Sequence, residues 1–116
     1  MKKLSYERTT RIVEIMRQEL AAVIQKDLHD PRLEIVSITE IKLAKDLSYA
    51  RVYVLVLGDH VQNVKALNHA AGFLRTKLAE KMSLRIVPQL KFYYDVERDR
   101  SQRVVNLIDE LATKKR

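Results

Sequence analysis

The chain has 116 residues, of which 47% are hydrophobic and 32% charged, a balance typical of a folded domain and not of a disordered segment. It contains no cysteine, which excludes disulfides and thiolate-held metals, and no apolar run approaches the ~18 residues of a membrane span. The formal net charge of +7 favours polyanionic partners. We therefore expect one cytoplasmic domain over residues 1–116, with no secretion signal and no membrane partner.

The first predicted element is an amphipathic helix over residues 8–28. Its apolar stripe consists of Ile12, Met16, Leu20, Val23 and Ile24. The helix should end in the phrase HDPR, because Pro31 cannot continue a helix and the residue before a proline is steered toward extended geometry.

Two strands joined by a short polar loop are predicted next. The first covers residues 34–43 (EIVSITEIKL) and is apolar on both parities at its start, which a β-bulge or two-sided burial would produce. The second, residues 49–57 (YARVYVLVL), alternates Ala50, Val52 and Val54 with Tyr49, Arg51 and Tyr53. An antiparallel hairpin is the simplest arrangement, with Gly58 and Asp59 as the turn that ends it.

A second helical stripe runs over residues 61–82 and continues across Gly72, one of only two glycines in the chain. An interior glycine costs a helix roughly 1 kcal/mol relative to alanine. We expect the helix to bend near Gly72 and not to end there.

A third strand is predicted in residues 86–95 (IVPQLKFYYD), with Leu90, Phe92 and Tyr94 on one face and Gln89, Lys91 and Tyr93 on the other. The helical crossover before it favours parallel pairing with the second strand. Ser101 is a plausible N-cap for a C-terminal helix over about residues 101–113, followed by a basic tail at 114–116. The order indicates an α+β domain of two layers, with the helices on one face of a small mixed sheet.

Enzyme signatures are absent from the sequence. The three histidines lie in different elements, and no zinc-protease, P-loop, nucleophile-elbow or dinucleotide fingerprint occurs. A small basic nuclease could use Asp27, His29 and Asp30, although a solvated helix end explains that cluster better. We expect no catalytic residue, no metal and no cofactor.

Positive charge concentrates in residues 61–95, which hold six basic residues and two acidic ones. On a helical projection, Lys65, His69 and Arg75 lie within about 60° of Gly72. The glycine could let a phosphate backbone approach while these cations neutralise it, or it could be a packing notch or kink against a neighbouring helix. The spacing alone favours the second alternative. Tyr49, Tyr53 and Tyr93 could stack bases, although half-buried strand positions suit them equally well.

Four phrases occur in a characteristic order: HDPRL, DLSYARVYV, AAGFLR and LRIVPQLKFYYD. In this order the sequence resembles the ribosome-binding factor A family, from about Arg8 to Asp95. The resemblance implies a type II KH-like fold, αββααβ, in which a kinked helix pair packs on a three-stranded mixed sheet. In this family an Ala-x-Gly kink, matched by Ala70-Ala71-Gly72, replaces the GxxG loop of most KH domains. Family members often have glycine where this chain has Glu34, which implies a different geometry at the start of the first strand.

The resemblance also implies a function. The protein would be a monomeric, non-enzymatic assembly factor with no small-molecule substrate. It would bind the free, immature small ribosomal subunit and its rRNA near the 5′-terminal helix, and promote late maturation and rRNA processing, including in cold adaptation. The predicted RNA-contacting residues are Lys65, His69, Gly72, Arg75, Lys77, Lys81 and Arg85, together with Lys45 and Arg51 at the hairpin. The alternative is a helix-turn-helix DNA-binding protein with AAG as its turn, although that motif is not usually flanked by strands.

Overall fold

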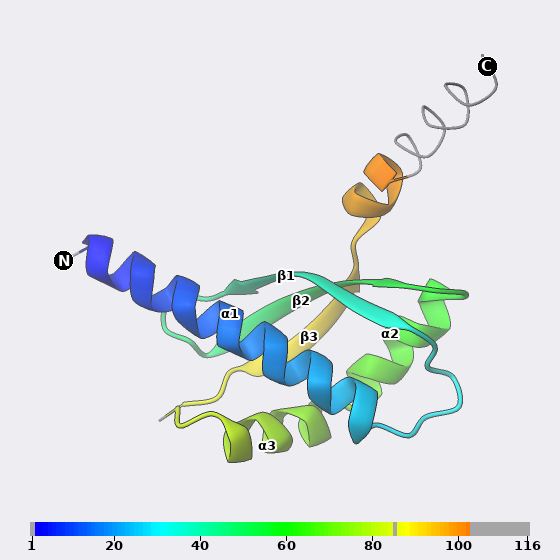
Figure 1. Ribbon diagram of the computed structural model, residues 1–116, viewed down its shortest axis with the longest axis horizontal. Helices are drawn as coiled ribbons and strands as arrows, with labels where there is room; N and C mark the ends of the chain where they lie inside the picture. The colour runs from blue at the N-terminus through cyan, green and yellow to red at the C-terminus, as the bar shows by residue number, and fades with distance from the viewer. Residues whose placement is uncertain (1, 85, 103–116) are drawn as a thin grey trace, which may run out of the picture.

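The computed structural model describes residues 2–84 and 86–102, which form helices and strands in the order αββααβ (Figure 1). The elements are α1 (Lys2–Lys26), β1 (Val36–Leu43), β2 (Tyr49–Val56), α2 (His60–His69), α3 (Ala71–Lys81) and β3 (Gln89–Tyr94). Residues 96–102 are helical as well. The predicted α+β order is confirmed.

The three strands form one mixed sheet in the order β1-β2-β3. β1 pairs antiparallel with β2, and β2 pairs parallel with β3, as the hairpin and the helical crossover predicted. The register of β1 shifts between Ile38 and Glu40, which is the bulge that the imperfect alternation indicated. Thr39 is the extra residue; its hydroxyl donates to the carboxylate of Asp95 and lies 3.3 Å from the carbonyl oxygen of Tyr53.

The hydrophobic core lies between one face of the sheet and the helices. Figure 1 shows α1 crossing the sheet, with α3 beside it. The largest fully buried side chains at the centre of the core are Phe92, Met16, Leu20, Leu67, Leu74 and Leu78. Burial of such a side chain stabilises the fold by roughly 1.5–3 kcal/mol, so this layer fixes where the helix pair sits on the sheet.

A side-chain amide closes the outer edge of β3. Asn68, near the end of α2, donates from Nδ2 to the carbonyl oxygen of Phe92 at 3.0 Å, and its Oδ1 accepts from the Phe92 N–H at 2.8 Å. One residue of α2 thus makes the two backbone bonds that a further strand would make.

A second asparagine joins the start of β1 to the start of α2. Asn63 is 1% exposed; its Oδ1 accepts from the Glu34 N–H at 2.8 Å and its Nδ2 donates to the Asp59 carbonyl oxygen at 2.7 Å. Gly58 has a φ of +99°, and a Cβ added there would overlap the carboxylate of Glu34. Glu34 therefore rests against the glycine turn that follows β2.

The starts of two helices differ from the predictions. α1 begins at Lys2, well before residue 8, because the additional residues include good helix formers that carry no apolar stripe to reveal them. The last helical segment begins at Val96, so Ser101 lies inside it and the predicted cap is wrong. Asp95 is the cap, since its Oδ1 accepts from the Arg98 N–H at 2.9 Å. The rest of that predicted helix, residues 103–113, and the tail at 114–116 lie outside the described residues.

Candidate nucleic-acid interface

The helix pair α2–α3 changes direction at Ala70. This residue has φ −89° and ψ 5°, and its N–H donates to the carbonyl oxygens of both Ala66 and Leu67 at 3.1 Å. α3 then begins at Ala71, with the Leu74 N–H donating to the Ala70 carbonyl oxygen at 2.9 Å. The prediction that one helix bends near Gly72 is therefore wrong in detail: the first helix ends at His69 and a new one begins two residues later.

This junction does not fit the helix-turn-helix alternative. That motif joins its helices through a turn of about three to four residues, whereas α2 and α3 are separated by Ala70 alone. In addition, the buried side chains of α3, Leu74 and Leu78, belong to the same core cluster as Phe92 of β3. α3 is thus part of the sheet-packing layer and does not stand out as a recognition helix.

Gly72 lies on the surface in the first turn of α3. Gly58 has a positive φ and Gly72 does not, so backbone conformation does not require glycine at position 72. A Cβ added there would meet nothing within 4 Å, which excludes the packing notch considered from the sequence. Nothing in the described residues accounts for this glycine, and its contact with RNA stays a prediction.

Two predicted cations lie on α2 and one at the end of α3. Lys65 and His69 are both exposed, as is Lys81. The positive charge of His69 contributes to lowering the pKa of Asp30, which places the C-terminal end of α2 close to the loop after α1. These three side chains are available to a phosphate backbone.

Two further predicted cations have internal partners. Arg75 donates from Nε to the carbonyl oxygen of Val87 at 3.1 Å, so it fixes α3 to the chain that enters β3. Lys77 lies 3.8 Å from a carboxylate oxygen of Glu80, and its Nζ is 5.7 Å from the ring centroid of Phe73. Exposed ion pairs of this kind are weak, so Lys77 can exchange its partner for a phosphate at little cost.

The cations of α3 do not form one face. At 100° per residue, Arg75 and Lys81 lie about 120° apart, on the two sides of the buried stripe formed by Leu74 and Leu78. Gly72 lies on the Arg75 side. The structure therefore divides the predicted RNA surface into a Gly72–Arg75 side and a Lys77–Lys81 side.

The remaining predicted residues lie elsewhere. Lys45 is exposed in the loop between β1 and β2, and Arg51 is exposed on the sheet face that points away from the helices. Arg85 lies outside the described residues. The register also places Lys42 and Lys91 on either side of Arg51, and neither was among the predicted contacts. Strand parity was the signal that could have found them.

The loop after α1 offers little to the nuclease hypothesis. The carboxylate of Asp30 accepts hydrogen bonds from Arg32 Nη2 at 2.7 Å, Nε at 3.1 Å and the backbone N–H at 2.9 Å. These bonds lower the pKa of Asp30 to about 2, far from that of an effective general base near neutral pH. Within residues 2–84 and 86–102, no group of three histidine or acidic side chains could hold a metal.

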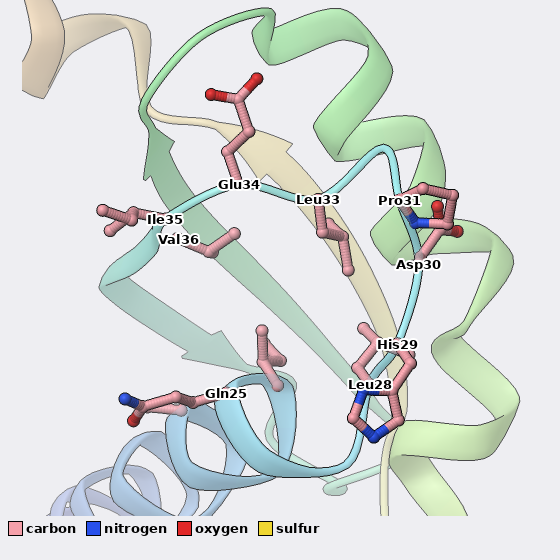
Figure 2. A pocket seen from close by; sticks show the side chains of 11 residues that line it. Gln25, Leu28, His29, Asp30, Pro31, Leu33, Glu34, Ile35 and Val36 are labelled. Carbon is pink, nitrogen blue, oxygen red and sulfur yellow. The ribbon is translucent and has the colours of Figure 1, made fainter.

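A cavity of about 750 Å³ lies between the end of α1 and the loop that leads into β1. Figure 2 shows Leu28, Leu33 and Val36 on its wall, with His29 and Glu34 from the same loop. Apart from these two, the polar lining consists of Gln25 and the Arg32-bound Asp30, and the cavity has no arrangement typical of catalysis.

Among the described helices, none has the length and apolar character that crossing a bilayer requires. The αββααβ order, with a kinked helix pair on a mixed three-stranded sheet, defines a type II KH-like domain. In KH domains the junction between two helices clamps a nucleic-acid backbone. The fold is thus that of the KH-like class, in which nucleic-acid binding is common.

The chain belongs to the ribosome-binding factor A family, because the family model described as "Ribosome-binding factor A" matches residues 8–108. It is 43% identical over 110 residues to ribosome-binding factor A of Chromohalobacter salexigens, covering 90% of this chain and 84% of the relative. It is 42% identical over 112 residues to that of Nitrosomonas europaea, covering 94% and 96%.

Solved structures agree with this assignment. The crystal structure of ribosome-binding factor A from Thermus thermophilus superposes with a TM-score of 0.70 at 30% identity, covering 73% of this chain and 92% of that one. A homology model of the Thermus thermophilus factor, as fitted into a cryo-EM map of its 30S complex, superposes with a TM-score of 0.62 at 32% identity, covering 70% and 88%.

Proposed function

We propose that this protein is a cytoplasmic, monomeric ribosome assembly factor that binds the free, immature small ribosomal subunit through its rRNA. Membership of the ribosome-binding factor A family carries the proposal, supported by the 30S complex of the Thermus thermophilus factor. It binds near the 5′-terminal helix of the rRNA, promotes late maturation and rRNA processing, including in the cold, and leaves once maturation is complete. It catalyses no reaction and takes no cofactor or small-molecule substrate.

Electrostatics supply most of the binding in this proposal. The net charge of +7 attracts the protein to rRNA, and phosphates displace counterions at the exposed cations of α2 and α3. Lys65 and Lys81 are exposed and form no ion pair within the described part of the chain, whereas Arg75 is held by Val87 and serves the fold as well. We therefore expect Lys65 and Lys81 to carry contacts that can be removed without harm to folding.

Co-sedimentation in sucrose gradients tests the proposal. The protein should migrate with free small subunits and not with assembled ribosomes. Its affinity should fall with salt, with a log–log slope of roughly −0.7 per phosphate neutralised on single strands. Charge reversal by Lys65→Glu or Lys81→Glu should release it, and comparing the two variants tells which side of the helix pair meets RNA.

The matched control is Lys26→Glu, an exposed lysine at the end of α1. It changes the net charge equally, so it separates local contact from general attraction. Failure of the wild-type protein to sediment with free subunits would overturn the proposed function. An affinity that does not change with salt concentration would show that phosphate contacts do not supply the binding.

A further inference from the structure

The face of the sheet that points away from the core is left uncovered by every described helix. Strand alternation places ten side chains on it: Ser37, Glu40, Lys42, Tyr49, Arg51, Tyr53, Leu55, Gln89, Lys91 and Tyr93. We call this surface the open sheet face. Its apolar content is carried by three tyrosines and by the half-buried Leu55.

Three cations form a row across the open sheet face. Lys42 pairs in register with Arg51, which pairs with Lys91, and all three are exposed. Strands lie about 4.8 Å apart, so the row spans only about 10 Å, and like charges opposite each other destabilise a sheet. Within the described part of the chain none of the three forms an ion pair. The nearby carboxylates are Glu40, in β1, and Asp95, whose pKa is lowered in part by Lys42.

The tyrosines next to this row form an ordered cluster. The rings of Tyr53 and Tyr93 stack with centroids 5.6 Å apart and planes at 28°. The interaction between the hydroxyl groups of Tyr49 and Tyr93 raises the pKa of Tyr49 and lowers that of Tyr93. Lys42 Nζ lies 5.4 Å from the Tyr53 centroid and Lys91 Nζ 5.6 Å from that of Tyr93. Aromatic rings are thus held at fixed positions among cations on a solvated surface.

We propose that the open sheet face binds single-stranded RNA, with phosphates on the Lys42–Arg51–Lys91 row and unpaired bases stacked on Tyr53 and Tyr93. Fixed aromatic rings beside a cationic track are the two components of single-strand recognition. The site lies on the layer opposite the helix pair, so it is a second RNA contact and not part of the first. The proposal rests on the proposed function, since both need rRNA as the partner.

An acidic protein segment is the competing occupant. It would satisfy the cation row, but it would gain little from the tyrosine rings. A planar base can stack on these rings once Lys42 and Lys91, which lie over them, turn to phosphates. The rings therefore favour RNA.

The test compares two fluorescein-labelled probes by anisotropy: a ten-nucleotide oligoadenylate and an abasic ribose-phosphate oligomer of equal length and charge. The wild type should bind oligoadenylate about tenfold more tightly, the usual effect of one stacked base. Tyr53→Leu or Tyr93→Leu should remove that preference and leave binding of the abasic probe within twofold. Lys91→Gln should weaken both probes several-fold, whereas Lys26→Gln should change neither.

A second measurement does not depend on the tyrosine variants folding. The chain has five tyrosines and no tryptophan, so base stacking should quench its intrinsic fluorescence with oligoadenylate and not with the abasic probe. Equal affinity for the two probes, without quenching, would overturn the inference. So would tyrosine variants, folded by circular dichroism, that keep the preference. Neither result contradicts the proposed function, which is overturned only if the wild type does not sediment with free small subunits.

Discussion

Gly72→Ala should make the protein more stable and bind its RNA partner less well. Alanine is favoured over glycine by roughly 1 kcal/mol in a helix interior, and about half of that is reasonable in the first turn of α3. The added methyl meets nothing within 4 Å, so no clash offsets the gain. The net stabilisation should be about 0.5 kcal/mol, which raises the melting temperature by roughly 2 °C for a domain of this size.

The opposite effect is expected on binding. If a phosphate backbone passes close to the Cα of Gly72, the methyl group displaces it, and affinity for free small subunits should fall several-fold. Thermal melts followed by circular dichroism and quantitative co-sedimentation measure the two effects on the same preparation. Ala21→Gly, at an exposed position of α1, is the reciprocal control: it should lower stability by about 1 kcal/mol and leave binding unchanged.

Two results would refute this reasoning in different ways. A lower melting temperature for Gly72→Ala would mean that the fold does require glycine there, against the open space around its Cα. A higher melting temperature with unchanged affinity would mean that no partner approaches this position, and the Gly72–Arg75 side would lose its role in binding.

Two further predictions concern the loop after α1 and its attachment to α2. Asn63→Ala removes two hydrogen bonds and leaves the Glu34 N–H without its partner. The free energy of unfolding, measured in urea, should therefore fall by about 2–3 kcal/mol. The control is Gln62→Ala at the exposed neighbouring position, which should change it by less than about 0.5 kcal/mol. If Asn63→Ala lowers the free energy of unfolding no more than Gln62→Ala does, the two hydrogen bonds of Asn63 do not stabilise the fold. Because Arg32 lowers the pKa of Asp30 from 3.8 to about 2, the ionised carboxyl stabilises the fold above about pH 4, and this contribution is lost as the pH falls toward 2. Wild type and Asp30→Asn should therefore differ in stability at pH 7 and converge near pH 2; a difference that persists in acid would exclude the ion pair as its cause.

The element order, the pairing of the strands and the bulge could all be predicted, because each leaves a local trace in spacing or parity. Spacing alone could not predict the break at Ala70, and only the family resemblance indicated a kink at Ala70-Ala71-Gly72. The neighbours of Ala70 are strong helix formers and the apolar stripe continues across it, so local propensity predicts an unbroken helix. What ends α2 includes long-range contact: Asn68 is bound to the backbone of Phe92, twenty-four residues later in the chain. Such a bond leaves no periodic signal.

The candidate site likewise has features that the sequence predicts and features that it does not. Exposure of Lys65 and His69 followed from helical phase. The separation of Arg75 from Lys81 by about 120° follows from the same phase, because both residues belong to α3. The cation row on the sheet required the register between strands, which depends on the bulge at Thr39 and on the length of the crossover. Parity alone gives the face of a side chain and not its neighbours.

The amide of Asn68 has a consequence for the behaviour of the protein in concentrated solution. A sheet with an open edge can add a strand from another molecule, and growth of this kind leads to aggregates. By engaging both backbone groups of Phe92, the amide removes from the middle of β3 the bonding positions that an incoming strand would need. An incoming strand can therefore pair with the middle of β3 only after displacing the Asn68 amide, so a single side chain of α2 raises the cost of edge-to-edge association on that side of the sheet.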